Sequence, residues 1–189
     1  NLAMAENTTL TILPGVELYV SDDVTIVIDG DINALGTTLN RITIAAENNY
    51  WNGFRLPHGS NSYFKYCIVK NILGTFMMNQ SSTYTSIEKS TFNDNTSWSG
   101  GNFRLFNTTS STNHDVIYSN FIENISFSLN NQHNRFTYNN FINNFGGAST
   151  STGIATGPIK YTTGWSDDTD TFGFNNVFSN TFNDIGVQS

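Results

Sequence analysis

The chain has 189 residues, enough for one domain with a continuous buried core. Hydrophobic residues make up 38% of it and aromatic residues 14%, which excludes an intrinsically disordered protein. The formal net charge is -7, and the 8 Lys and Arg residues are scattered singly, which excludes a protein that binds nucleic acid through a basic face.

The N-terminal part of the chain alternates apolar and other residues in short runs. Apolar side chains recur at every second position in residues 10–12, 18–20, 24–28, 32–34 and 42–44, and Gly and Pro separate these runs. Such alternation between turn residues is typical of β-strands. No stripe with the helical period is present, and the abundant Asn, Thr, Ser and Gly are poor helix formers. We therefore predict an all-β protein.

The later part of the chain carries a repeat. Five segments share an apolar residue followed five positions later by a large apolar one, and in four of them an Asn comes three positions after that. The large residues are Ile68, Phe92, Phe121, Phe141 and Phe182. The Asn residues are Asn71, Asn95, Asn124 and Asn144.

This repeat predicts a single right-handed parallel β-helix. Successive coils of such a solenoid lie about 4.8 Å apart, so equivalent residues stack. Repeated Phe would form an internal column, and repeated Asn a ladder of amide hydrogen bonds. We expect one domain over residues 1–189, with N-terminal coils in 1–56 and Asn/Phe-rich coils in 57–189. Two alternatives stay open: chance repetition in an Asn-rich chain, and an antiparallel sandwich, which would need more tight hairpin signals than the single Asn52-Gly53.

The N-terminal runs also resemble a known superfamily. Residues 9–18 (Thr-Leu-Thr-Ile-Leu-Pro-Gly-Val-Glu-Leu) and residues 28–37 resemble the opening coils of secreted and cell-surface parallel β-helix proteins of the pectate-lyase-like superfamily. Residues 41–44 (Arg-Ile-Thr-Ile) and 51–56 (Trp-Asn-Gly-Phe-Arg-Leu) follow in the order expected there. The resemblance implies the fold and leaves the activity open, because this superfamily contains adhesins, filament proteins and polysaccharide-cleaving enzymes.

Catalytic patterns of that superfamily are not found, so we predict no catalytic residue and keep a divergent polysaccharide lyase or glycoside hydrolase as an alternative. Lyases of this fold use a calcium cluster and an Arg or Lys base. Asp167, Asp168 and Asp170 lie in one expected loop and are the candidate calcium ligands, with solvated loop acids as the alternative. The three His residues share no metal-ligand spacing, and we expect them to be exposed: His58, His114 and His133.

Binding partners are the remaining question. Trp98, Trp165 and Tyr161 stand beside polar residues in expected loops and are candidate glycan-binding residues, although Trp rings also pack between coils. No segment resembles a helix that would cap the solenoid, whose ends present unpaired strand edges. We therefore expect an extracellular structural or adhesive protein whose copies stack end to end, or which forms part of a larger surface protein. Carbohydrate binding is the alternative. Membrane insertion is not expected, because no apolar stretch reaches about 18–20 residues.

Overall fold

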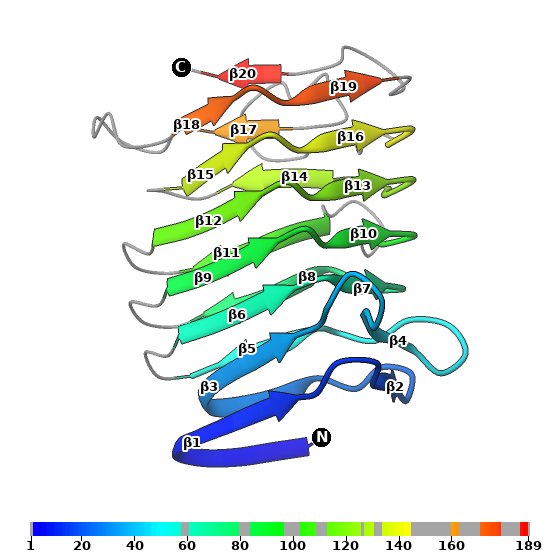
Figure 1. Cartoon of the computed structure of the whole chain (residues 1–189), viewed down its shortest axis with the longest axis vertical. Helices are drawn as coiled ribbons and strands as arrows, with labels where there is room; N and C mark the ends of the chain where they lie inside the picture. Colours follow the sequence, from blue (N-terminus) through cyan, green and yellow to red (C-terminus); the bar gives the residue numbers. More distant parts are fainter. Residues whose placement is uncertain are drawn as a thin grey trace.

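The described residues form a parallel β-solenoid, in which short strands follow one another around an axis and successive coils stack along it (Figure 1). The structure is a computed structural model and describes residues 2–57, 61–79, 84–96, 103–108, 113–125, 127–130, 134–144, 160–162, 171–178 and 186–188. Every regular element in these ranges is a strand, as predicted. None of the described residues belongs to a helix that is long and apolar enough to cross a lipid bilayer.

The coils build three walls. The first wall consists of β6 (Asn61–Lys65), β9 (Tyr84–Glu88), β12 (Asn113–Ile117), β15 (Asn134–Thr137) and β18 (Thr171–Gly173). The second wall consists of β2 (Glu17–Val20), β4 (Ile42–Ala46), β7 (Cys67–Lys70), β10 (Thr91–Asn93), β13 (Asn120–Ile122), β16 (Asn140–Ile142) and β19 (Asn176–Phe178). The third wall consists of β5 (Phe54–Leu56), β8 (Thr75–Asn79), β11 (Phe103–Thr108), β14 (Phe127–Asn130), β17 (Lys160–Thr162) and β20 (Gly186–Gln188).

Two longer strands, β1 (Leu2–Ile12) and β3 (Ile26–Leu35), bend and take part in both the third and the first wall. Ile26 of β3 pairs with Phe54 of β5, whereas Ile32 pairs with Ser62 of β6. The first and third walls are therefore one 13-stranded sheet joined through β3, and the second wall is a separate seven-stranded sheet. Gly30 lies at the bend. The position needs a glycine because a Cβ there would collide with the backbone of β1.

The aromatic residues of the repeat stack inside the second wall. Phe92 pairs with Phe121, and Phe121 pairs with Phe141. Their ring centroids lie 5.4 and 4.9 Å apart with interplanar angles of 17° and 12°. All three side chains are fully buried. The predicted internal Phe column is confirmed, and with it the parallel stacking of these coils.

The predicted alignment is wrong by one position for the first repeat. Val69, rather than Ile68, lies in register with Phe92. Ile72, rather than Asn71, donates its backbone N–H to the ladder Asn of the next coil. Because side chains alternate between the two faces of a strand, this shift moves Ile68 from the core to the outer face. Asn71 lies at a corner with a φ of 60°.

The last repeat is also placed differently from the prediction. Val177 pairs with Phe141 and so continues the Phe column at the backbone level. It occupies the position predicted for Phe182, which lies outside the described residues. Loop length explains the error, because loops of any length can join stacked strands without changing their register.

Two corners of the repeat coils hold residues in the left-handed backbone region, which residues other than Gly and Asn rarely adopt. The corner between the first and second walls has φ values from 51° to 59° at Tyr66, Lys89, Tyr118, Tyr138 and Phe174. The corner between the second and third walls has φ values from 53° to 60° at Asn71, Asp94, Glu123 and Asn143. The paired strands on both sides of each corner hold these residues in place.

Candidate functional site

Inside the corner between the second and third walls, Asn side chains form a ladder along the axis, which we call the inner Asn ladder (Asn95, Asn124 and Asn144). Asn124 Oδ1 accepts the Asn95 Nδ2 amide at 2.8 Å and the Asn95 backbone N–H at 3.2 Å. Asn124 Nδ2 donates to Asn144 Oδ1 at 2.9 Å. All three residues are fully buried. The predicted Asn ladder is confirmed for these three positions.

A second ladder lies inside the corner between the first and second walls, and the sequence reasoning missed it. Backbone N–H groups donate to the next coil's side chain in turn, from Cys67 to Ser90, from Ser90 to Ser119, from Ser119 to Asn139 and from Asn139 to Asn175. The signal in the sequence is the Ser or Asn directly after four of the five residues at this corner, as in Tyr118-Ser119 and Tyr138-Asn139.

Cys67 begins this second ladder, and its side chain packs inside the solenoid. Its Sγ donates to the carbonyl oxygen of Ala34 at 3.3 Å. The side chain is fully buried, and burial raises the pKa of the thiol to about 12. Since the thiolate is the reactive form of cysteine, this residue is a structural one.

Two columns run along the outside of the solenoid, one on the second wall and one at its corner with the first wall. The first is an amide column, in which Asn140 Nδ2 donates to Asn120 Oδ1 at 2.7 Å and Asn176 Nδ2 donates to Asn140 Oδ1 at 3.0 Å. The second, which we call the corner aromatic column, contains Tyr118, Tyr138 and Phe174, with exposures of 53%, 48% and 77%. A solvent-exposed row of aromatic rings beside amides is a candidate binding surface.

The orientation of these rings restricts what they can bind. The centroids of Tyr118 and Tyr138 lie 5.2 Å apart and those of Tyr138 and Phe174 lie 5.1 Å apart, with interplanar angles of 19° and 8°. The ring faces therefore cover one another, and the column presents ring edges and Tyr hydroxyls to solvent. Platforms that stack on the flat face of a sugar need free ring faces. The column suits edge contacts and hydrogen bonds.

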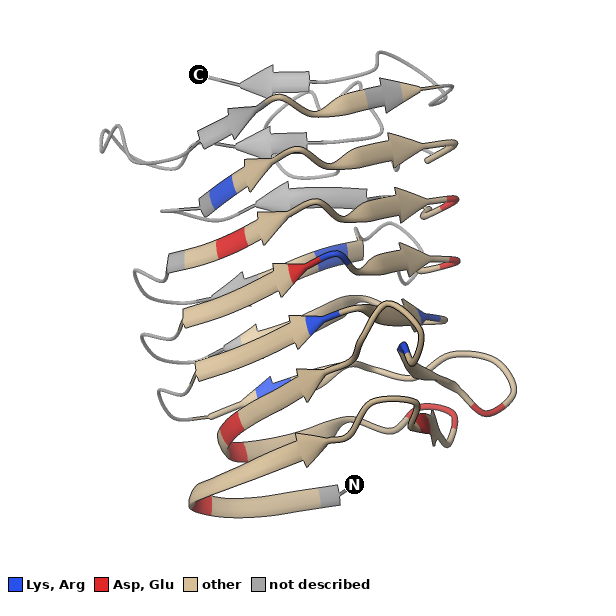
Figure 2. Cartoon of the chain, viewed as in Figure 1, with Lys and Arg blue, Asp and Glu red and all other residues tan. Residues whose placement is uncertain are grey.

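Charged side chains pair between coils on the outside of the first wall. Lys65 Nζ lies 2.7 Å from Glu88 Oε2, and this ammonium is the main reason why the pKa of Glu88 is lowered. Arg135 contacts both carboxylate oxygens of Asp115 at 3.0 Å. Figure 2 shows charges scattered along the coils, with acidic residues gathered near the N-terminal coils.

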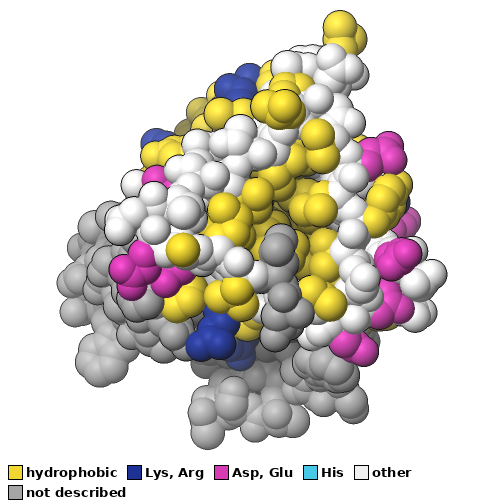
Figure 3. Space-filling model, turned by 90° about the horizontal axis from the view of Figure 1, so that it is seen from below, with side chains coloured by type: hydrophobic (Ala, Val, Ile, Leu, Met, Phe, Trp, Pro, Cys, Tyr) yellow, Lys and Arg dark blue, Asp and Glu magenta, His cyan; other side chains and the backbone are white. Residues whose placement is uncertain are grey.

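The N-terminal end of the solenoid is the second candidate surface. Apolar side chains gather over its centre, with acidic residues toward the rim (Figure 3). Leu10 and Leu18 are only partly buried, whereas the residues paired with them one coil higher, Ile32 and Ile44, are fully buried. Among the described residues, the outer edges of β1 and β2 pair with no strand. An additional coil below would complete the core at this end.

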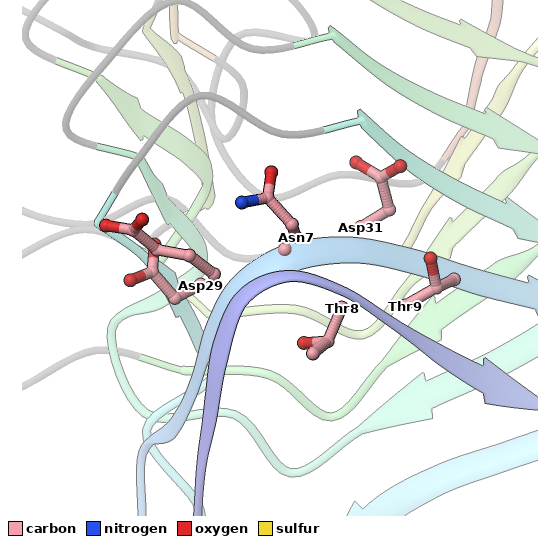
Figure 4. Close-up of a pocket in the computed structure, with 7 residues that line it drawn as sticks. Asn7, Thr8, Thr9, Asp29 and Asp31 are labelled. Carbon is pink, nitrogen blue, oxygen red and sulfur yellow. The ribbon is translucent and has the colours of Figure 1, made fainter.

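A pocket of about 450 Å³ opens at the bend of β1 and β3 (Figure 4). Its lining is polar and consists of Glu6, Asn7, Thr8, Thr9, Asp29, Gly30 and Asp31. Asp31 Oδ1 accepts the backbone N–H of Asn61 at 2.8 Å, which ties this acid to the neighbouring coil. Within the described ranges no group of three His, Cys, Asp or Glu residues is placed to hold a metal ion.

Most residues predicted to bind glycan or calcium fall outside the part of the chain that the structure describes, namely Trp98, Trp165, Asp167, Asp168 and Asp170. Tyr161 lies in β17, where it pairs with Leu129 and Val187. His114 corrects the expectation of exposed histidines, since it is 1% exposed inside the solenoid. Sequence reasoning failed there because the inward position of a strand usually carries an apolar residue.

Comparison of the chain with protein-family models, with curated proteins and with solved structures finds no match.

Proposed function

We propose that this chain is an extracellular structural or adhesive β-solenoid, akin to the non-enzymatic proteins of the pectate-lyase-like superfamily, whose copies stack end to end. The N-terminal end carries this proposal. There the inward columns of the first and second walls continue to Leu10 and Leu18 and leave both side chains partly exposed. Burial of apolar surface is the main driving force of association, so this end favours a further coil.

The occupant of that end must offer parallel strands at the positions of three walls. The opposite end of a second copy has this geometry, with β18 and β19 in the first and second walls and β20 in the third (Figure 1). Residues 1–56 contain seven acidic and two basic residues. Two N-terminal ends would therefore repel each other, which favours head-to-tail contacts. Such contacts do not close and produce filaments.

The test combines sedimentation velocity over a range of concentrations with electron microscopy. We expect linear stacks for the unchanged chain and for Leu39→Glu, whose side chain is 93% exposed and makes a matched control. We expect Leu18→Glu to remove the stacks, because it places a charge on the end face. Circular dichroism must show that this variant folds, and Leu10→Glu replaces it otherwise. A strictly monomeric unchanged chain at high concentration contradicts the proposal.

Polysaccharide binding is the second candidate, and the exposed corner aromatic column favours it. The measurement is affinity electrophoresis in gels that contain neutral or uronate polysaccharides, with Tyr138→Ala compared with the unchanged chain. Retardation that the variant loses supports binding through this column. A separate incubation of the chain with pectin or alginate tests the enzymatic alternative, because a lyase would produce an unsaturated product that is measured by its absorbance.

A further inference from the structure

One inward column of the first wall is polar. Ser62 of β6 pairs with Thr85 of β9, and Thr85 pairs with His114 of β12, so the three side chains occupy the same position in three successive coils. Their exposures are 0%, 0% and 1%. The column begins directly above Ile32, with which Ser62 is in register. We call these three residues the polar seam.

The polar atoms of the seam have no hydrogen-bond partner in the part of the chain that the structure describes. Six buried side-chain polar atoms are unpaired there, and four of them belong to the seam: Ser62 Oγ, Thr85 Oγ1, His114 Nδ1 and His114 Nε2. Native proteins satisfy the great majority of buried polar groups with protein or water. Four unpaired atoms in one column therefore indicate a common partner.

Among the described side chains, those that face the seam supply no such partner. The imidazole of His114 stacks on the Phe106 ring with centroids 4.0 Å apart and an interplanar angle of 13°. Phe106 is in register with Met77, and Met77 with Phe54, so the facing column of the third wall is apolar. In the described part of the chain, the facing side chains therefore leave these groups to be satisfied along the seam itself.

No direct bond joins the seam atoms to one another, and the coil spacing fits a bridging molecule. Equivalent atoms in adjacent coils lie about 4.8 Å apart, which is too far for a hydrogen bond between two hydroxyl groups. A water molecule about 2.8 Å from each of two such oxygens spans this distance with a near-tetrahedral angle. Water can also donate to one nitrogen of a neutral imidazole and accept from the other's N–H. Burial lowers the pKa of His114 to about 3, so the ring is neutral near pH 7.

We propose that Ser62, Thr85 and His114 form an internal binding site for ordered water that runs along the axis of the solenoid. Each water bridges consecutive coils in the same direction as the Asn and Ser ladders at the corners. The site is independent of the end-to-end stacking proposed above, because it lies inside the first wall.

Oxygen-17 magnetic relaxation dispersion on the full chain tests this site, since it counts long-lived internal waters. Thr85→Val removes one hydroxyl without changing the shape of the side chain, and Thr43→Val makes the same change on the outer face of β4. We expect Thr85→Val to lower the dispersion amplitude by about one water molecule, because a buried water bonds to about three polar groups. Thr43→Val should leave the amplitude unchanged.

Ser62→Ala provides the same comparison if Thr85→Val does not fold. An amplitude that is the same in the unchanged chain and in the seam variant overturns the proposal. The seam would then be dry, and the same Thr85→Val variant would unfold at a higher temperature than the unchanged chain, because an unsatisfied buried hydroxyl had been removed.

Discussion

Replacement of Asn124 by Ala is the most direct test of the inner Asn ladder. The Asn124 side chain is fully buried and takes part in four hydrogen bonds with three residues. Its Oδ1 accepts two bonds from Asn95, and its Nδ2 donates to the Phe92 carbonyl and to Asn144. Ala cannot replace any of these bonds.

The magnitude follows from the groups left without partners. In the variant, the Asn95 backbone N–H and its side-chain amide lose the oxygen that accepts from both. An orphaned buried polar group costs about 1–3 kcal/mol. Two such groups predict that the free energy of unfolding falls by about 2–6 kcal/mol. Asn93→Ala is the control, because among the described residues the Asn93 amide bonds to Asp94 alone, on the outside. We expect this variant to change stability by about 0.5 kcal/mol at most.

Two measurements check this prediction. Urea denaturation followed by circular dichroism gives the stability difference between the variants. Hydrogen exchange at the Asn95 amide gives a local value. The exchange rate should increase about 30-fold or more in Asn124→Ala, since each 1.4 kcal/mol is a factor of ten. Equal stabilities of Asn124→Ala and Asn93→Ala, or an unchanged exchange rate at Asn95, would refute the reasoning about the ladder.

Four further outcomes are expected. The free energy of unfolding falls by about 2 kcal/mol between pH 6.5 and 5. The reason is that burial depresses the pKa of His114 in the folded chain, so the unfolded chain binds the proton first. His114→Phe, compared with the unchanged chain by urea denaturation, lacks this loss. In the same assay, Val69→Asn lowers the free energy of unfolding by about 3 kcal/mol or more, and Ile68→Asn by about 1 kcal/mol or less, because Val69 faces the core. The reverse order would contradict the register of this strand. Cys67 reacts with a chromogenic disulfide reagent at pH 8 only after unfolding, so fast reaction of the folded chain would show the thiol to be accessible. Tyr138→Gly is about 1 kcal/mol more stable than Tyr138→Ala and unfolds at a higher temperature, because the backbone at this position has a φ of 59°. Equal stabilities of the two variants would argue against the left-handed corner.

The fold was predictable because a parallel solenoid transfers its period directly to the sequence. Equivalent positions stack, so Phe92, Phe121 and Phe141 recur with an Asn three residues later, and the structure places all three rings in one column. The register of the first repeat was not predictable from apolar spacing alone. Residues 63–68 and 64–69 both show an apolar pair five positions apart. A one-residue slip between them reverses every side chain of the strand.

The corner residues would have resolved that slip. Tyr66 occupies the same corner position as Tyr118 and Tyr138, and each stands three residues before an inward apolar residue of the second wall. The last coil could have been placed in the same way, since the pair Asn175-Asn176 repeats Asn139-Asn140. The number of residues between successive corners could not have placed the coils, because the loops between the strands differ in length.

The polar seam and the N-terminal end face could not be predicted from the sequence. Ser62 and Thr85 occupy inward positions where alternation predicts apolar residues. Only the pairing of β6, β9 and β12 brings them and His114 into one column. The partial burial of Leu18 depends on which coil lies at the end of the stack, and a local pattern carries no such information.

Both side-chain ladders begin at the same coil, and this divides the solenoid into two kinds of core. Within the described ranges, Ile72 and Cys67 accept no ladder bond from below, yet each donates its N–H to the coil above. An apolar residue and a thiol therefore start the two ladders. Below them, the coils are held by aliphatic side chains such as Ile32 and Ile44 together with Trp51. Above them, buried amides and hydroxyls join one coil to the next and share the interior with the Phe column. The N-terminal end, which exposes apolar side chains, is thus the end whose coils depend most on apolar burial. A further coil at that end would be held by the same hydrophobic force that holds the N-terminal coils to one another.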